Sequence, residues 1–359
     1  KVAVDVPTGV NADSGETEGE AVRADLTITF HKEKLGLSKA KKYVGELIVA
    51  SVGIPPEAEL FTGPGDVTLV TKARRPESRK GDFGRLLIVG GSETYTGAPT
   101  YVALAALRTG VDLAYVAAPE PAALTISSFS PNLIAIKMKG DHFSSDNLDE
   151  IQPWLEKATG LVIGPGLGVH SETISAIDGF LDIVERVKRP LLLDADAIKA
   201  FGKHRRRFET SVVLTPHAGE FKAVSGHEPS ADPQEKIREV HTLAHELKST
   251  ILLKSHVDVI SDGIRWKLNR TGNPGMTVGG TGDVLSGVVG AFLSQGYDPF
   301  HASCAGAFIN GAAGDFVYSE KGYHMVATDL IEKIPSVMDD PMSHRSLKLL
   351  QNIGPEIHS

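Results

Sequence analysis

The segment from Asn273 to Gly287, Asn-Pro-Gly-Met-Thr-Val-Gly-Gly-Thr-Gly-Asp-Val-Leu-Ser-Gly, constrains the fold more than any other part of the chain. Glycine has no Cβ and tolerates positive φ, so the amides around Gly279, Gly280 and Gly282 can converge on one phosphate. The apolar residues that follow recur with helical spacing, which predicts an amphipathic helix that begins near Gly282 and points its positive end at the same anion. These residues are Val284, Leu285, Val288, Val289, Phe292 and Leu293.

A single carboxylate, Asp283, follows these glycines. A carboxylate is normally unfavourable beside a phosphate, so Asp283 is interpreted as a base that takes a proton from a hydroxyl while the amides hold the transferring phosphoryl group. The alternative is an ordinary helix start in which Thr281 or Asp283 is a first-turn cap. That alternative explains one acidic residue but not the glycines around it.

Several other polar or glycine-rich turns follow short, continuously apolar runs, which is typical of strands that are covered on both faces. In an open α/β sheet, ligands bind at the carboxyl ends of such strands. The pattern therefore predicts one large α/β domain whose binding residues lie at this edge. The apolar runs and the turns after them are Leu86–Val89 with Gly90–Pro99, Leu161–Ile163 with Gly164–Gly168, Leu191–Leu193 with Asp194–Ala197, and Val212–Leu214 with Thr215–Glu220.

Gly279-Gly280-Thr281-Gly282-Asp283 resembles the GxGD signature of the ribokinase-like superfamily, and Asn273-Pro274-Gly275-Met276 narrows the resemblance to the NAD(P)H-hydrate dehydratases. The resemblance implies a ribokinase-like three-layer α/β/α domain with a mostly parallel central sheet. It also implies that ADP, with Mg²⁺, drives dehydration of the S epimer of hydrated NADH or NADPH. The ring hydroxyl would be phosphorylated and phosphate would then be eliminated.

The same resemblance implies roles for individual residues. Asp283 is expected to be catalytic and to contact the substrate. The other expected substrate contacts are Ala98, Gly166, Gly168 and His217, and the expected adenine nucleotide contacts are Lys254, Ser255, His256, Val257, Asp258, Gly280 and Gly282. The family has a Lys-Gly-x-Gly-Thr-like stretch after Lys254, and this chain departs from it at Ser255 and His256.

Some candidate site residues also fit a purely structural role. His217 taken alone is typical of an exposed loop residue, and Lys254 taken alone is typical of a lysine whose stem is buried and whose charge reaches solvent. Asp194 and Asp196 could hold Mg²⁺ directly or through water, but they could equally cap the next helix.

The first sixty or so residues resemble the C-terminal third of an NAD(P)H-hydrate epimerase domain, which has a Rossmann-like α/β fold, through Asp5–Gly9, Ala24–Phe30 and Gly45–Ala50. Asp5 would then contact the hydrated nicotinamide and catalyse epimerisation, and Thr8 would help to bind K⁺. Without the resemblance, this stretch is typical of a strand end and a Pro-Thr-Gly turn. The chain begins within a strand-like pattern and without methionine, so we expect the rest of that site to lie on a missing upstream segment or on a separate chain of the same protein.

The expected organisation is an epimerase part at residues 1–62, a dehydratase domain at residues 63–345 and a tail at residues 346–359. A linker is expected between Ile54 and Asp66, where prolines and glycines cluster. By family resemblance we also expect a homo-oligomer.

Composition excludes several function classes. A net charge of −8 argues against a nucleic-acid surface, and the basic run Lys203–Arg207 is interpreted as a solvated connection. With Cys304 as the one cysteine, the chain has neither a disulfide framework nor a cysteine metal site. No apolar run is long enough to span a bilayer, so we expect no membrane contact and a cytoplasmic enzyme.

Two alternative functions stay open. One is a small-molecule kinase of the ribokinase-like superfamily, and the other is a non-catalytic module that senses nucleotides. The Asn-Pro-Gly-Met stretch and the loop Tyr95–Pro99 argue against the first. Asp283 argues against the second, because a neutral residue would make it easier to bind a polyanion.

Overall fold

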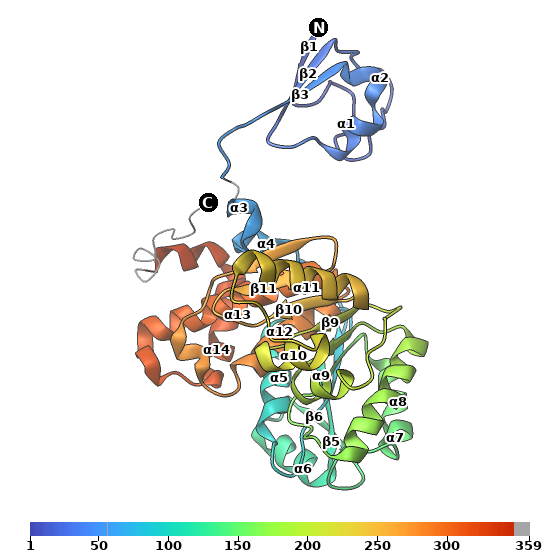
Figure 1. Ribbon diagram of the computed structural model, residues 1–359, viewed down its shortest axis with the longest axis vertical. Coiled ribbons are helices and arrows are strands. Elements are labelled where there is room, and N and C mark those ends of the chain that lie inside the picture. The colour runs from blue at the N-terminus through green and yellow to red at the C-terminus, as the bar shows by residue number, and fades with distance from the viewer. Residues whose placement is uncertain (56, 348–359) are drawn as a thin grey trace. The chain divides into compact units, whose positions relative to one another are not determined.

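The computed structural model describes residues 1–55 and 57–347 (Figure 1). Contacts between residues divide the chain into two compact units, Lys1–Glu59 and Leu60–Ser359. Residues 348–359, which include most of the predicted tail, lie outside the described part of the chain. None of the described helices is both long and apolar enough to cross a membrane.

The first unit is a small sheet of three parallel strands in the order β1-β2-β3, with two short helices. Its core consists of Leu37, Ala40 and Val44, supported by partly buried neighbours. Its elements are β1 (Val2–Val4), β2 (Leu26–Phe30), α1 (Leu35–Lys39), α2 (Lys41–Val44) and β3 (Glu46–Ala50).

Two short helices occupy part of the predicted linker, α3 (Glu57–Leu60) and α4 (Pro64–Thr68). α4 begins with a proline, whose fixed φ suits the first helical position. Its Asp66 carboxylate accepts a hydrogen bond from the Gly63 N–H at 2.9 Å and pairs with Lys267 at 2.7 Å. This segment is therefore more ordered than a Pro/Gly-rich linker suggests.

The second unit is built on a nine-stranded sheet in the order β12-β11-β10-β9-β8-β7-β4-β5-β6. The strands from β10 to β6 in this order are parallel, and β11 and β12 add an antiparallel hairpin at one edge. The strands are β4 (Arg85–Val89), β5 (Leu113–Pro119), β6 (Ile134–Met138), β7 (Gly160–Ile163), β8 (Leu191–Leu193), β9 (Val212–Leu214), β10 (Thr250–Leu253), β11 (Asp258–Ser261) and β12 (Trp266–Asn269).

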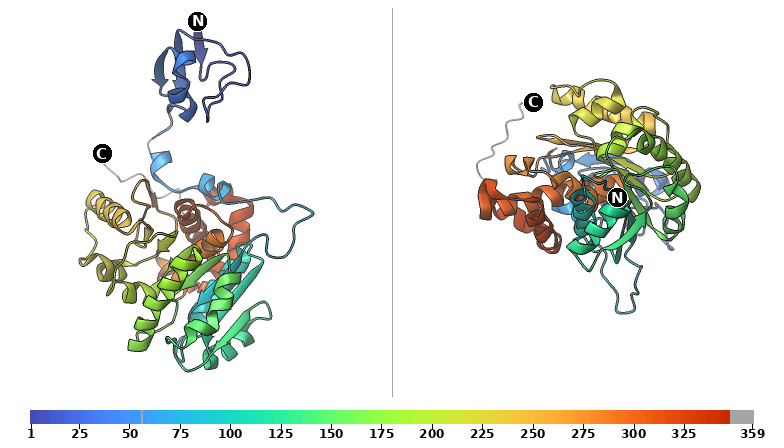
Figure 2. Two further views of the ribbon diagram at one scale, coloured as in Figure 1. Left: turned by 90° about the vertical axis from the view of Figure 1, so that its right-hand side faces the viewer. Right: turned by 90° about the horizontal axis from the view of Figure 1, so that it is seen from below.

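Helices cover both faces of this sheet, as the views in Figure 2 show. One layer contains α5 (Gly97–Arg108), α6 (Glu120–Phe129), α12 (Thr281–Ser294), α13 (Pro299–Lys321) and α14 (Ala327–Asp339). The other contains α7 (Asn147–Lys157), α8 (Ser171–Val187), α9 (Ala195–Phe201), α10 (Ala218–Ser225) and α11 (Pro233–Leu247). Three 3₁₀ turns complete the unit: η1 (Pro274–Thr277), η2 (Gly322–His324) and η3 (Pro341–Ser346).

Alternate residues of each central strand enter different cores. Leu86 and Ile88 of β4 pack with the α5 and α12 layer, and Leu87 and Val89 pack with the α7 and α8 layer. This alternation explains why the strands are continuously apolar, because a parallel strand buries both faces. The predicted three-layer α/β/α domain with a mostly parallel sheet is confirmed.

The helix after the glycine-rich turn differs from its prediction in one respect. It starts at Thr281, close to the expected Gly282, but it is not amphipathic, because every residue from Val284 to Ser294 is buried. α12 packs against α5 and α13 and lies on β7 and β8, so no side of residues 284–294 faces water. The spacing of its large apolar residues predicted one buried face. The small residues between them, such as Gly287 and Gly290, are buried as well, which the spacing alone did not indicate.

Candidate active site

Polar side chains from four separated segments meet at the carboxyl edge of the parallel strands. Asp194 follows β8, Glu220 lies in the first turn of α10 after β9, and Lys254 follows β10. Asp283 lies in the first turn of α12. Neighbouring parallel strands end side by side, which brings Asp194, Glu220 and Lys254 together, and the start of α12 adds Asp283 to the same site.

Asp194 ties this edge to α12. Its carboxylate accepts a hydrogen bond from the Lys254 ammonium at 3.0 Å and another from the Ser286 hydroxyl at 2.7 Å. Asp194 occupies the N-cap position of α9, yet its side chain makes no cap bond there. The capping alternative for Asp194 is therefore not what the structure adopts.

Lys254 is the positive centre of the cluster. Besides Asp194, its ammonium lies 3.9 Å from a Glu220 carboxylate oxygen. Burial works against the charged ammonium, but the carboxylates of Asp194, Glu220 and Asp283 outweigh it and raise the pKa of Lys254. Lys254 thus stays charged and is not the solvated surface lysine of the plainer reading.

Asp283 has the opposite balance. Burial raises the pKa of its carboxyl group to about 7, helped by the nearby negative charges of Asp194, Asp196 and Glu220, and Lys254 counters only part of this shift. A carboxylate with a pKa close to neutrality can accept a proton efficiently under neutral conditions. Its burial and its charged neighbours therefore suit the general-base role predicted for it.

The N-terminus of α12 carries no side-chain cap among the described residues. Gly280 is the N-cap residue and has φ 97°, which a side chain would strain. The Thr281 hydroxyl points back and donates to the Met276 carbonyl at 2.8 Å, so it secures the turn and leaves the first amides of the helix unused. A Cβ at Gly282 would lie 3.5 Å from the Lys254 ammonium, which places that positive charge beside the same helix end.

The loop after β7 lies against the start of α5. Gly166 has φ 69°, and a Cβ there would come within 2.9 Å of the Tyr95 side chain and 3.3 Å of the Ala98 methyl. Gly168, with φ 78°, donates its N–H to the Asp196 carboxylate at 2.9 Å. Ala98, Gly166 and Gly168 are thus grouped beside the cluster, and their substrate contacts stay predictions.

His217 caps α10. Its Nδ1 accepts hydrogen bonds from the Gly219 and Glu220 amides at 3.0 and 3.3 Å, which leaves the proton on Nε2, 3.3 Å from the Glu220 carboxylate. The imidazole is more than half exposed, so one face remains open to a ligand. The structural role of His217 is thus compatible with the predicted contact.

The turn between β10 and β11 holds the remaining predicted nucleotide contacts. Ser255 and His256 are exposed, and Val257 is half-buried. Asp258 accepts hydrogen bonds from the Ser255 N–H and from the Asn269 amide, both at 2.9 Å, and burial raises its pKa to about 6. The Asp258 carboxylate therefore shapes this turn, and contacts from residues 255–258 to a nucleotide stay predictions.

In the first unit, Asp5 has a left-handed backbone with φ 65°. Its carboxylate pairs with the Lys34 ammonium at 2.7 Å and accepts a hydrogen bond from the Thr29 hydroxyl at 3.0 Å. The hydrogen bond from Lys34 is the main cause that lowers the pKa of Asp5. Thr8 is exposed, and its carbonyl accepts the Val22 N–H at 2.9 Å.

Two members of the cluster were not among the predicted site residues. Ser286 lies one turn after Asp283, where a serine in an apolar helix is the only sequence signal. Glu220 is 4% exposed and makes a capping box with His217, which the spacing His-x-x-Glu at a helix start could have indicated.

Comparison with known families gives two matches. Residues 86–336 match the model of the NAD(P)H-hydrate dehydratase family, and residues 1–36 match that of the YjeF-related protein N-terminus. A protein of Pyrobaculum aerophilum named bifunctional NAD(P)H-hydrate repair enzyme Nnr is 51% identical over 342 residues, which are 94% of this chain and 67% of that protein. A second protein of this name, from Hyperthermus butylicus, is 43% identical, and the chain covers 64% of its length.

A solved structure is similar as well. The ADP/ATP-dependent NAD(P)H-hydrate dehydratase of Bacillus subtilis, co-crystallised with ATP and Mg²⁺, superposes with a TM-score of 0.65 at 25% identity. The match covers 80% of this chain and 99% of that one. This similarity supports the three-layer α/β/α fold with a mostly parallel sheet.

Proposed function

Because the chain belongs to the NAD(P)H-hydrate dehydratase family, we propose that it repairs hydrated nicotinamide nucleotides. The substrate is the S epimer of NADH or NADPH hydrate, and an adenine nucleotide, with ADP the expected donor, drives its dehydration. The names of its relatives support this proposal, since one from Cenarchaeum symbiosum, 40% identical to this chain over 287 residues, is called an ADP-dependent (S)-NAD(P)H-hydrate dehydratase.

The chemistry follows from Asp283 and the end of α12. The Asp283 carboxylate takes the proton of the ring hydroxyl, whose oxygen then attacks the terminal phosphorus of the nucleotide. The bond from that phosphorus to its bridging oxygen breaks, so AMP leaves when ADP is the donor and ADP leaves when ATP is the donor. The free amides near Gly280 and Gly282, together with Lys254, neutralise charge on the transferring phosphoryl group. Phosphate then leaves with the electrons of the ring C–O bond, the adjacent ring carbon loses a proton, and the reduced nicotinamide is restored.

The donor set fits Mg²⁺ held through water. The Asp194 carboxylate is engaged by Lys254 and Ser286, and that of Asp196 by the Gly168 N–H and Lys199. Each of these carboxylate oxygens already serves one partner, so Asp194 and Asp196 would hold the ion more readily through water molecules than by direct ligation. When bound, Mg²⁺ neutralises charge on the nucleotide phosphates.

The observation that carries this proposal is the neutral-range pKa of Asp283 beside an uncapped helix end. The test follows absorbance of the reduced nicotinamide from chemically hydrated NADH with Mg²⁺ and ADP, ATP or no nucleotide. Recovery only with nucleotide is expected, and the ratio of the two rates identifies the donor. Asp283→Asn should abolish recovery while nucleotide binding, measured by calorimetry, is retained.

An ordinary small-molecule kinase is the second candidate, because the same geometry would serve any hydroxyl. Absence of recovery with every nucleotide, together with phosphorylation of another alcohol, would replace the dehydratase proposal by this one.

For the first unit we propose a contribution to epimerisation of the R and S hydrates. Asp5 would act on the hydrated ring, and Thr8 would help to hold K⁺. The match of residues 1–36 to the YjeF-related N-terminus supports this assignment. Interconversion of purified R hydrate by the full-length protein, lost in Asp5→Asn, would test it.

A further inference from the structure

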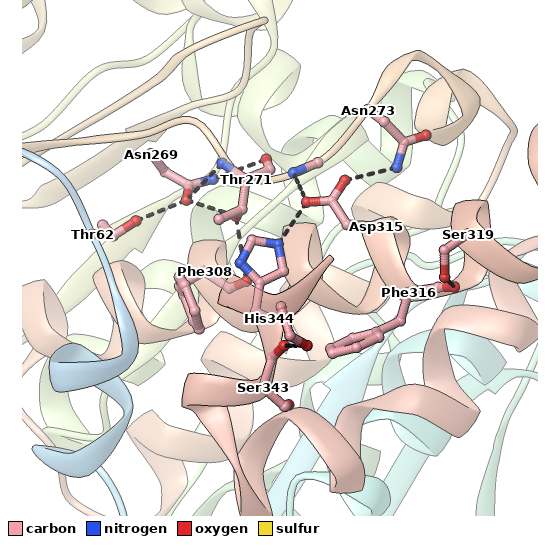
Figure 3. Close-up of polar contacts among 12 residues, drawn as sticks. Thr62, Asn269, Thr271, Asn273, Phe308, Asp315, Phe316, Ser319, Ser343 and His344 are labelled. Carbon is pink, nitrogen blue, oxygen red and sulfur yellow. Dashed lines mark hydrogen bonds and ion pairs between the residues drawn. The ribbon is translucent and has the colours of Figure 1, made fainter. Parts of the chain in front are cut away.

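A buried polar network links Asn273, Asp315 of α13 and His344 of η3 (Figure 3). Its centre is Asp315, which is 4% exposed. One carboxylate oxygen accepts the Asn273 amide N–H at 2.9 Å, and the other accepts the Gly272 backbone N–H at 3.0 Å and His344 Nε2–H at 2.8 Å. Asp315 thus joins the loop before η1 to the C-terminal turn η3.

His344 is the contribution of η3 to this network. It is 4% exposed, and its ring packs edge-on against Phe308 at 5.5 Å and Phe316 at 6.2 Å between centroids. The imidazole therefore lies against two phenyl rings and donates its hydrogen bond to the Asp315 carboxylate. His344 is therefore part of the packed interior of the protein and is not a surface side chain.

The other side of the network leads to the anion-binding turn. Asn273 uses its side-chain carbonyl to accept the Gly275 N–H at 3.0 Å, which starts η1. Only Val278, Gly279 and Gly280 separate η1 from α12. The position of Asn273 therefore helps to fix where the amides of Gly280 and Gly282 and the carboxylate of Asp283 lie, because only a short turn connects them.

Close packing makes this connection stiff. A Cβ at Gly314 would meet the Met276 sulfur at 2.3 Å, and one at Gly311 would meet the Thr271 hydroxyl at 2.2 Å. The loop thus lies directly on α13 and can move only if its hydrogen bonds to Asp315 loosen. His344 is what completes the hydrogen bonding of that carboxylate.

We propose that His344 is a positioning residue for the reaction. It holds Asp315, which holds Gly272 and Asn273, so that the turn presents its amides and the Asp283 carboxylate in the geometry that phosphoryl transfer needs. This inference rests on the proposed function for its kinetic readout. It adds to that function a C-terminal element that touches neither nucleotide nor substrate.

The test compares two substitutions of different character. His344→Phe keeps a ring between Phe308 and Phe316 but removes the donor, whereas His344→Gln retains an N–H that can reach the Asp315 carboxylate. We expect His344→Phe to lower kcat for hydrated NADH with Mg²⁺ and ADP or ATP by roughly 10- to 100-fold, since misplacement by ~1 Å has effects of this order. KM for the hydrate should change little, and His344→Gln should recover most of kcat.

A matched control is His204→Phe, the same change in an exposed pair in which His204 contacts Asp178 at 2.6 Å, and it should behave as the wild type. A wild-type kcat in His344→Phe would overturn the proposal. The proposal would also be overturned if His344→Phe and His344→Gln lost kcat equally and in proportion to their fall in melting temperature. That result would show that His344 has only a structural role.

Hydrogen exchange of the 272–282 amides separates this inference from the proposed function, since it needs no substrate. We expect faster exchange in His344→Phe than in the wild type or in His344→Gln. If the wild type restores no NADH, the proposed function fails but this measurement still decides the inference. Unchanged exchange would overturn the positioning role even in an active enzyme.

Discussion

At the scale of single residues, the burial of Asp283 has one consequence for rate and another for stability. Burial and three neighbouring carboxylates raise its pKa to about 7, so at neutral pH this group is divided between its two protonation states. Only the ionised form can accept the proton of a hydroxyl.

The first prediction concerns the pH dependence of the rate. We expect kcat/KM for the nucleotide to rise with pH up to about 7 and then to level off, because this ratio reports the enzyme before nucleotide binds. The rise of kcat with pH should occur at a higher pH than the rise of kcat/KM, since the negative charge of the bound nucleotide opposes ionisation of Asp283. Steady-state rates between pH 5 and pH 9 would check both limbs, and a flat profile would contradict the assignment of the base.

The second prediction concerns stability. The pKa of Asp283 is about 7 in the folded state against 3.8 as the ordinary value, so the folded state holds more protons between these limits. Its contribution to stability is therefore complete below about pH 4 and is lost as the pH rises through 7. Asp283→Asn should raise the free energy of unfolding at pH 8 by on the order of a few kcal/mol, and by much less at pH 4.

Denaturant unfolding at these two pH values would measure that difference. Ser286→Ala is a useful comparison, because it removes a hydroxyl from the same helix without removing a charge. It should destabilise the protein at both pH values, since it takes a hydrogen-bond donor from buried Asp194. A stabilisation by Asp283→Asn that does not depend on pH would contradict the charge argument.

Residues of the site differ in how far the sequence could identify them. Asp283 and Lys254 stand next to recognisable turns, and the strand ends place them at one edge. Ser286 and His344 carry no such signal, because their partners Asp194 and Asp315 are 92 and 29 positions away. Their roles come from tertiary contacts that no local pattern encodes.

At the scale of elements, the packing of α12 fixes where its N-terminus points. A Cβ at Gly287 would lie 2.3 Å from the Val102 carbonyl oxygen and 2.7 Å from the Ala105 methyl, both in α5. α12 and α5 are therefore in backbone contact. The apolar runs of the strands were predictable because each strand is buried on both faces, whereas this contact depends on glycines that a helix pattern treats as weak positions.

The third prediction follows from this contact. Gly287→Ala should separate α12 from α5, destabilise the protein by about 1–3 kcal/mol and lower kcat, because Asp283 moves with its helix. Gly65→Ala in α4 is the matched control, since a Cβ there meets no described atom within 4 Å. It should be neutral or slightly stabilising, and thermal unfolding with steady-state kinetics would distinguish the two. Equal effects of both changes would contradict the packing argument.

At the scale of the whole molecule, the two units differ in how much core they bury. The second unit has an extensive core on each face of its sheet, whereas the core cluster of the first consists of Leu37, Ala40 and Val44 with a few half-buried neighbours. A domain of about sixty residues buries a smaller share of its surface than a larger one and is only marginally stable. The glycine and strand patterns indicated that the first sixty residues form a separate part, but they gave no measure of this difference.

The last prediction is that the second unit carries the dehydratase by itself. Every described hydrogen bond of Asp194, Glu220, Lys254 and Asp315 is made within residues 60–347, so a chain of residues 60–359 should keep its melting temperature and its kcat with hydrated NADH, Mg²⁺ and nucleotide. Residues 1–59 alone should show little cooperative unfolding, since three core residues cannot offset the conformational entropy of about sixty. Differential scanning calorimetry of both pieces, with the Asp283→Asn form of the longer one as the inactive control, measures this directly. Loss of both stability and turnover in residues 60–359 would contradict this prediction and would show instead that the dehydratase depends on residues 1–59.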